Sequence, residues 1–422
     1  MSDIVNSKAV LVSIAERGSD VEECNISLDE LERLLNTAGG ECFAKVIQVK
    51  ESFDPRTCIG KGKVKEIQDL CNNNGVKLVV FDFDLTPAQI RNLENDIGDV
   101  TVIDRSMLIL DIFALHAVSS EGKLQVELAQ LKYTAPRLTG KGIELSRQGG
   151  GIGSRGPGES KLETDRRHLH ERVVNLEKKL SELEENRAVM RSQRDKSGIV
   201  KIALVGYTNA GKSTLLNRLT GADVLCEDKL FATLDPTTRK SELPSGVSVL
   251  FTDTVGFIRK LPHHLVKAFK STLDEVKYAD ILLLVSDATD PEADLHIEVT
   301  REIISELGAS DKSIIYVYNK CDKLEECEYT KINDNSVMIS AASGEGIDEL
   351  LSLIDDVVNR EKRKVHLSVP YHSQAVVNQL YKEYQVEEVE YRDEGVFVTA
   401  VLDSKGLGMY SDYIIKDENS DG

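Results

Sequence analysis

Apolar residues recur along the chain with two spacings, one typical of buried strands and one typical of amphipathic helices. In the first 120 residues, the expected strands are 9–14, 41–49, 78–82 and 100–103, and the expected helices are 27–38, 64–73, 87–96 and 106–117. Strands that alternate with helices are typical of an α/β domain with a largely parallel sheet. We therefore predict an N-terminal α/β domain over residues 1–120.

The pattern changes at residue 121, where apolar residues begin to recur at steps of four and three. This stripe runs from Leu124 to Leu138 and predicts a helix that Pro136 is expected to end. After a glycine-rich loop, apolar residues return at every seventh position from Leu162 to Met190, which is the spacing of a coiled coil. Residues 121–197 are therefore predicted to form an antiparallel helical hairpin with a glycine-rich tip.

The remaining chain is expected to form two further α/β units. Between residues 198 and 360, apolar runs of strand length end in polar loops and alternate with helices, which predicts a doubly wound, mostly parallel sheet. Residues 361–422 predict a small α+β domain. Its expected strands are 365–369, 386–391 and 396–402, its expected helix is 374–384, and its polar tail is expected to be disordered.

Composition and charge narrow the class of protein. The 422 residues are 41% hydrophobic and 29% charged, the apolar runs are no longer than a strand, and no leader pattern begins the chain. Seven cysteines without a C-x-x-C pair fit a reducing cytosol. We expect a cytoplasmic protein without a transmembrane segment, and a monomer. The net charge of −19 argues against general nucleic-acid binding, so no DNA partner is expected.

A phosphate-binding loop follows the apolar run 202–205. Its residues fit the pattern G-x-x-x-x-G-K-[ST] and are Gly206, Tyr207, Thr208, Asn209, Ala210, Gly211, Lys212 and Ser213. The two glycines allow a tight turn whose N–H groups face a polyphosphate at a helix N-terminus. Lys212 is expected to reach the β- and γ-phosphates, and the Ser213 hydroxyl is expected to bind Mg²⁺.

Three later motifs select guanine nucleotides. The first, D-x-x-G, is Asp253, Thr254, Val255 and Gly256; Asp253 should hold Mg²⁺ through water, and the Gly256 N–H should meet the γ-phosphate. The second, N-K-x-D, is Asn319, Lys320, Cys321 and Asp322. A carboxylate there can accept from N1–H and N2–H₂ of guanine, a donor pair that adenine lacks. The third is Ser340, Ala341 and Ala342, whose backbone N–H groups can reach guanine O6.

The segment between the phosphate loop and Asp253 must sense the γ-phosphate. Its residues include Phe231, Ala232, Thr233, Leu234 and Asp235. Thr233, Thr237 or Thr238 is expected to bind Mg²⁺ only when GTP is present.

The residue after D-x-x-G is Phe257, although GTPases often use a glutamine there to orient the attacking water. Intrinsic turnover should therefore be slow. The expected catalytic residues are Lys212, Thr233, Gly256 and Asn209, and Asn209 is expected to help to bind K⁺ beside the phosphates. A GTP-regulated RNA-binding scaffold with negligible hydrolysis is the alternative. A metabolic P-loop kinase has no use for N-K-x-D.

Basic residues gather near the hairpin tip. Residues 132–172 hold nine Lys or Arg against five Asp or Glu. This excess favours a finger that contacts phosphates over a plain connector, and its candidate residues are Arg147, Arg155, Lys161, Arg166 and Arg167. Farther upstream, the turn 60–63 could equally hold a phosphate or simply begin a helix.

The sequence closely resembles the HflX-type GTPases, in the translation-factor-related class of P-loop GTPases. The matching stretches include GKGKVKEI (60–67), FDLTPAQIRNLE (83–94), GSRGPGESKLETDRR (153–167), LFATLDPTTR (230–239) and DTVGFIRKLP (253–262). The resemblance implies a cytoplasmic protein that binds the large ribosomal subunit, hydrolyses GTP and takes part in ribosome splitting, rescue or biogenesis. It also favours Thr233 as the switch ligand and implies that the tip contacts rRNA. It leaves the role of residues 60–66 open, with ATP, RNA or no ligand as the alternatives.

Overall fold

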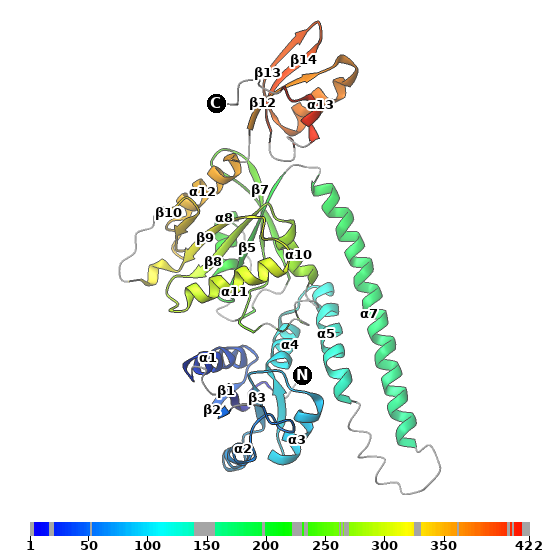
Figure 1. Ribbon diagram of the computed structural model, residues 1–422, viewed down its shortest axis with the longest axis vertical. Helices are drawn as coiled ribbons and strands as arrows, with labels where there is room; N and C mark the ends of the chain where they lie inside the picture. Colours follow the sequence, from blue (N-terminus) through cyan, green and yellow to red (C-terminus); the bar gives the residue numbers. More distant parts are fainter. Residues whose placement is uncertain are drawn as a thin grey trace.

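The computed structural model describes residues 4–16, 21–50, 53–138, 157–195, 199–221, 230–231, 235–260, 262, 265, 270–324, 331–360, 363–402, 406 and 409–415. Three sheets follow one another along the long axis of the molecule, and one long helix runs beside the first two of them (Figure 1). The division into residues 1–120, 121–197, 198–360 and 361–422 stays a prediction. The α/β class is confirmed.

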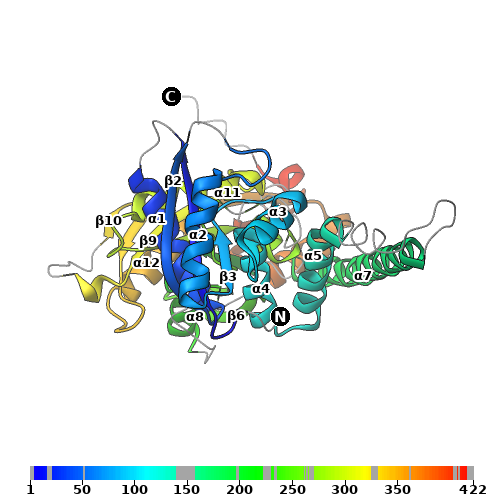
Figure 2. The same ribbon diagram turned by 90° about the horizontal axis from the view of Figure 1, so that it is seen from below.

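The N-terminal sheet is parallel throughout and has the order β2-β1-β3-β4. Its strands are β1 (Lys8–Glu16), β2 (Glu41–Lys50), β3 (Leu78–Phe81) and β4 (Thr101–Asp104). Its helices are α1 (Val21–Thr37), α2 (Lys61–Asn74), α3 (Pro87–Ile97) and α4 (Arg105–His116). Alternate residues of β1 face opposite sides, so Leu11 packs with α1 and α4 while Val10 and Val12 pack with α2 and α3. Figure 2 shows this layering from below.

The hairpin is confirmed as a pair of antiparallel helices, α5 (Ser120–Leu138) and α7 (Pro157–Asp195). Leu176 of α7 is buried between them, and ion pairs of 2.7–2.8 Å join Lys132 to Glu177, Arg172 to Glu127 and Arg187 to Glu121. The expectation that Pro136 ends α5 is wrong, because the helix continues to Leu138. So close to the C-terminal end, the missing proline N–H removes only one helical hydrogen bond.

The central sheet has seven strands in the order β10-β11-β9-β8-β5-β7-β6. The strands are β5 (Val200–Gly206), β6 (Thr237–Glu242), β7 (Ser248–Asp253), β8 (Ile281–Asp287), β9 (Ser313–Asn319), β10 (Lys331–Asn333) and β11 (Ser336–Met338). Only the edge strands β6 and β10 are antiparallel to their neighbours. The mostly parallel sheet is therefore confirmed, whereas the short edge strand β10 was not expected.

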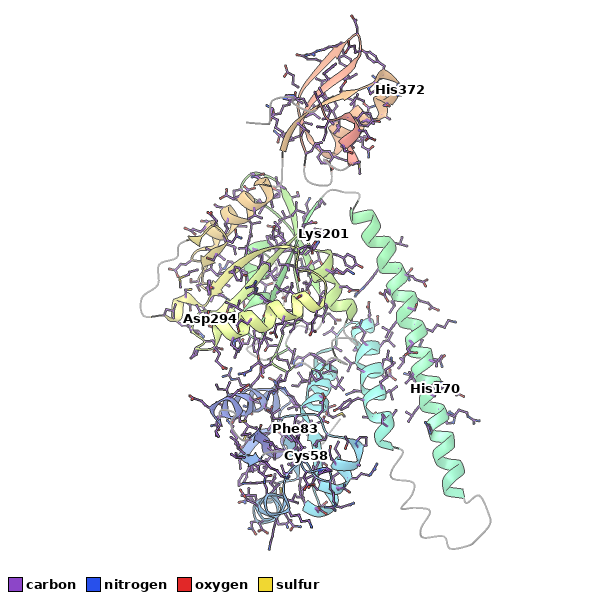
Figure 3. All side chains as sticks on the ribbon, in the orientation of Figure 1. Cys58, Phe83, His170, Lys201, Asp294 and His372 are labelled. Carbon is purple, nitrogen blue, oxygen red and sulfur yellow. The ribbon has the colours of Figure 1, made fainter. Side chains whose placement is uncertain are left out.

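Helices cover both faces of the central sheet, as a doubly wound fold requires. Ile202 and Leu204 of β5 pack with α8 (Lys212–Thr220) and α12 (Ile347–Arg360). Ala203 and Val205 face the other way, towards α10 (Lys270–Tyr278) and α11 (Ala293–Glu306). This second face is turned towards the N-terminal sheet, and side chains fill the space between α11, where Asp294 is labelled, and α1 (Figure 3). A single apolar core extends from α1 to α11.

The C-terminal sheet is antiparallel, with the order β12-β14-β13. Its elements are β12 (Arg363–Val369), β13 (Gln385–Arg392), β14 (Gly395–Leu402) and α13 (Gln374–Glu383), which packs on one face. The expected α+β arrangement is confirmed. Short 3₁₀ turns lie at Cys321–Lys323, Tyr371–Ser373 and Ser411–Tyr413. Among the described residues, none of the helices has the length and apolar character needed to cross a bilayer.

Candidate functional site

The phosphate loop connects β5 to α8, and its two glycines are required by the close approach of other groups. Gly206 has a φ of 149°, and a Cβ there would lie 2.1 Å from the Val285 carbonyl oxygen. Gly211 has a φ of 93°, and a Cβ there would lie 2.2 Å from Asn319 Nδ2. No side chain fits at either position, so the spacing in the sequence reflects packing as well as phosphate binding.

Lys212 and Ser213 begin α8 at the base of this loop. The Lys212 ammonium is buried and donates to the carbonyl oxygens of Gly206 (3.1 Å) and Tyr207 (2.7 Å). Burial lowers the pKa of Lys212 to about 8, although the Asp253 carboxylate opposes this shift. The Ser213 hydroxyl donates to Asp253 Oδ2 at 2.6 Å. Two of the three residues expected at the magnesium site therefore lie together, and their hydroxyl and carboxylate oxygens are of the kind that Mg²⁺ prefers, directly or through water.

The D-x-x-G loop lies directly on the phosphate loop. The Thr208 N–H donates to the Phe257 carbonyl at 2.8 Å, and the Phe257 N–H donates to the Gly206 carbonyl at 3.1 Å. A Cβ on Gly256 would lie 2.7 Å from Thr208 Cγ2 and 3.0 Å from Lys212 Nζ, so only glycine fits. Thr254 donates to the Leu204 carbonyl at 2.6 Å. Val255 and Phe257 are buried in the core that β5 shares with α1 and α11, so the phenyl ring contacts apolar side chains.

The N-K-x-D and S-A-A loops meet at the ends of β9 and β11. Asn319 connects three segments, because its Nδ2 donates to the Ala210 carbonyl and its Oδ1 accepts from the Ala341 N–H, both at 2.9 Å. The Ser340 hydroxyl donates to Asp322 Oδ1 at 2.6 Å and so orients that carboxylate.

Lys320 and Cys321 complete the N-K-x-D motif. Lys320 lies in the left-handed region at φ 66° and pairs with Asp287 at 2.8 Å. Cys321 is buried, and its thiol faces the Tyr318 carbonyl. The four motifs gather at the carboxyl ends of parallel strands, where doubly wound folds bind their ligands.

The segment expected to sense the γ-phosphate is described only in part. Ala232, Thr233 and Leu234 lie outside the described residues, as do Arg147 and Arg155 of the hairpin tip. Of the alternative threonines, Thr237 and Thr238 both belong to β6, where Thr238 is hydrogen-bonded to Thr252 across the strand pair. The role of Thr233 stays a prediction. Asn209 is exposed at φ 61° in the phosphate loop.

The flanks of that segment lie against the start of the hairpin. The ring of Phe231 packs edge-on against Phe113 of α4, with 4.7 Å between the ring centroids. The Asp235 carboxylate accepts from the backbone N–H groups of Val118 (3.2 Å) and Ser119 (2.7 Å) and from the Ser119 hydroxyl. The Ser119 hydroxyl in turn accepts from the Gly122 N–H in the first turn of α5, so Asp235 holds the residue that caps this helix.

A second polar cluster joins the phosphate loop to the N-terminal sheet, and the sequence motifs did not reveal it. The Tyr207 hydroxyl donates to Glu30 of α1 and accepts from the Arg259 N–H at 2.7 Å. Burial, followed by the charge of Glu30, raises the pKa of Tyr207. The Tyr207 ring stacks on His296 of α11, with 3.7 Å between the ring centroids. The phosphate loop is thus in contact with three separate elements.

Arg105 holds the acidic side of this cluster. Its guanidinium is buried and pairs with Glu30 and with Asp82, the latter at 2.9 Å, and it donates to the Arg259 carbonyl at 3.0 Å. Lys260, one residue farther along, pairs with Asp82 at 3.1 Å. The segment that follows D-x-x-G is therefore bonded to the N-terminal sheet through charged groups.

Comparison with known families agrees with this arrangement. Four family models match in order along the chain: "GTP-binding GTPase N-terminal" at 25–114, "GTP-binding GTPase Middle Region" at 116–194, "50S ribosome-binding GTPase" at 201–320 and "HflX C-terminal domain" at 327–405. GTPase HflX of Lacrimispora saccharolytica is 48% identical over 417 residues, which cover 98% of each chain. The chain belongs to the HflX family of GTPases. It is therefore a hydrolase that acts on GTP.

Other HflX relatives are similar over most of their length. GTPase HflX of Escherichia coli (strain K12) is 41% identical over 394 residues, which cover 92% of this chain and 91% of that one. Among solved structures, a GTP-binding protein of Sulfolobus solfataricus in complex with GDP is 27% identical, with a TM-score of 0.44, over 83% of this chain and 98% of that one. The last HflX family model begins before β10, so it spans the edge of the central sheet as well as the C-terminal sheet.

Proposed function

We propose that this HflX GTPase binds the large ribosomal subunit in its GTP state and couples hydrolysis to ribosome splitting, to rescue of stalled ribosomes or to ribosome biogenesis. The observation that carries the proposal is the contact of Asp235 with the start of α5. A segment that senses the γ-phosphate and a basic helical hairpin are joined at this point. The description "50S ribosome-binding GTPase" of the family model that matches residues 201–320 supports the same partner.

The nucleotide would lie across the loops described above. The phosphate-loop residues 206–213 would surround the phosphates, and Asp322 would accept from the guanine N1–H and N2–H₂. The S-A-A loop would meet O6, although the N–H groups of Ser340 and Ala341 are already bonded within the protein. Ser213 and Thr233 would bind Mg²⁺ directly and Asp253 through water, and Asn209 would help to bind K⁺. Bound there, the ions would neutralise charge that develops on the phosphates. The Lys212 ammonium and the Gly256 N–H would meet the same charge.

Slow intrinsic hydrolysis follows from the surroundings of Phe257. Its phenyl ring is 1% exposed within an apolar core and carries no group that can orient water. We expect the ribosomal subunit to complete the site or to rearrange the D-x-x-G loop. The same observation favours a second candidate, a GTP-regulated RNA-binding scaffold with negligible hydrolysis.

The test is single-turnover GTP hydrolysis with and without purified large subunits, together with co-sedimentation in a non-hydrolysable GTP analogue and in GDP. The proposal requires a sharp rise in rate and binding that depends on the analogue. Binding without a rise in rate would favour the scaffold, and no binding would overturn both. A variant with Arg147→Glu and Arg155→Glu in the hairpin tip should bind GTP normally but lose the subunit. Repeating the hydrolysis assay in potassium and in sodium tests whether a K⁺ ion bound beside Asn209 assists the reaction, and equal rates would contradict that role.

Further expectations accompany this function. We propose that the protein acts as a monomer in the cytoplasm and contacts rRNA through the hairpin tip. The side chains of Arg166 and Arg167 near the tip are exposed on α7, as such a contact requires.

A further inference from the structure

Arg218 connects two parts of the nucleotide site that no sequence motif joins. It lies in the last turn of α8, the helix that begins with Lys212 and Ser213. Its Nε donates to the Ala341 carbonyl at 3.2 Å, and its Nη2 donates to the Ala342 carbonyl. The guanidinium therefore binds two successive carbonyl groups of the S-A-A loop with two different nitrogens. Lysine has only one nitrogen and cannot reproduce this fork.

The loop residues that follow Ala342 lie close to the same guanidinium. Gly344 has a φ of 95°, and a Cβ there would lie 3.4 Å from Arg218 Cζ. The Ser343 N–H donates to the Ser340 hydroxyl at 3.1 Å, and the Gly344 N–H donates to the Ser340 carbonyl at 2.8 Å. Residues 340–344 thus form a tight turn, and Arg218 holds the carbonyl groups of Ala341 and Ala342 within it.

Peptide geometry shows what this contact achieves. The Ala341 carbonyl and the Ala342 N–H belong to one trans peptide group and point in opposite directions. Because Arg218 holds the carbonyl on the α8 side, the Ala342 N–H is turned away from α8. The Ala341 N–H is already bonded to Asn319 Oδ1. Within the described part of the chain, no residue accepts from the Ala342 N–H, which leaves this donor for a ligand.

We propose that Arg218 is a positioning residue for base specificity, which orients the Ala341–Ala342 peptide so that its N–H donates to guanine O6. The inference rests on the proposed placement of the base at Asp322. A charged donor on the carbonyl also polarises the peptide and strengthens its N–H as a donor. Adenine would present its own N6–H₂ to the same N–H, so the fixed peptide disfavours adenine as well as favouring guanine.

A thermodynamic cycle tests the coupling between Arg218 and O6. We would measure equilibrium affinities of the wild type and of Arg218→Ala for GDP and for 6-thio-GDP, in which a weakly accepting sulfur replaces O6. The wild type should bind GDP about tenfold more tightly than 6-thio-GDP, as expected for loss of one hydrogen bond, and the variant should lose most of that preference. Arg218→Lys should lie between the two. Arg301→Ala, which removes an exposed arginine of α11, should match the wild type.

The outcomes separate a positioning role from a structural one. If Arg218→Ala weakens both nucleotides by the same factor, or neither of them, the proposal is wrong. Should this variant fail to fold, Arg218→Gln, which keeps a donor but not the fork, provides the second arm of the same cycle. Failure of the proposed function would be detected without any variant, because the wild type would then bind ADP as tightly as GDP.

Discussion

Asp322 shows how one carboxylate can choose the base. Ser340 holds one of its oxygens at 2.6 Å, which orients the carboxylate towards the place expected for guanine N1–H and N2–H₂. In Asp322→Asn, an amide N–H₂ would face those donors, whereas xanthine offers a carbonyl at the 2-position. We expect GTP affinity to fall at least about a hundredfold and xanthosine triphosphate affinity to rise, as measured by calorimetry. Unchanged GTP affinity would mean that Asp322 does not contact the base.

His296 makes stability depend on pH. Burial lowers its pKa, although Asp290, Glu292 and Glu30 oppose the shift, while Arg259 reinforces it. An unfolded chain restores the ordinary value of about 6.5 and so binds more protons than the folded protein at lower pH. The free energy of unfolding contributed by this residue therefore decreases as the pH falls through 6.5.

His296→Phe should keep the ring stack on Tyr207 and remove this titration. Denaturant unfolding at pH 7.5 and pH 5.5 should show a larger loss of stability for the wild type than for the variant. Equal losses would contradict the assignment. Other groups that titrate in this range are common to both proteins and cancel in the comparison.

At the scale of elements, the contact between Asp235 and α5 links nucleotide sensing to the hairpin. Asp235→Ala removes the acceptor that holds Val118 and Ser119, which should cost about 1 kcal/mol and increase hydrogen exchange at the start of α5. GTP affinity should stay unchanged, because Asp235 faces α5, whereas stimulation by large subunits should decrease. Glu184→Ala, which removes an exposed carboxylate of α7, is the control. Full stimulation in Asp235→Ala would show that the hairpin does not depend on this contact.

Elements with a strong local pattern could be predicted from the sequence. β5 and β9 are apolar runs that end in a motif, so the existence of each strand and the position of the phosphate and base loops followed from local residues. Two features of these elements were not predicted from the sequence. Pro136 lies within α5, since one lost hydrogen bond near a helix end is tolerated, and β10 has only three residues, too few for a periodic pattern.

The contact between the two larger sheets is a feature of the whole molecule. Its central polar residues are Glu30, Arg105 and Tyr207. Arg105 follows Glu30 by 75 positions in the chain, and Tyr207 follows Glu30 by 177 positions. None belongs to a pattern that marks an interface, because buried ion pairs depend on tertiary packing and leave no periodicity in the sequence. Arg218 escaped for the same reason, since its partners are the backbone carbonyls of a distant loop.

Arg105→Met should reveal how strongly this interface holds the fold. The variant leaves Glu30 and Asp82 buried without their guanidinium partner, and removing one side of a buried ion pair costs about 3–5 kcal/mol. Denaturant unfolding should show this loss, whereas Arg33→Met, on the exposed side of α1, should have little effect. A variant as stable as the wild type would mean that solvent or Lys260 replaces the lost charge.

The position of Tyr207 limits how far the parts of this protein can be exchanged. One hydroxyl of the phosphate loop is bonded both to α1 and to the segment after D-x-x-G. A chimera that takes its first 120 residues from another protein would have to supply an acid in the place of Glu30, or replace the tyrosine together with it. The phosphate loop and the N-terminal sheet are therefore best transplanted as one unit.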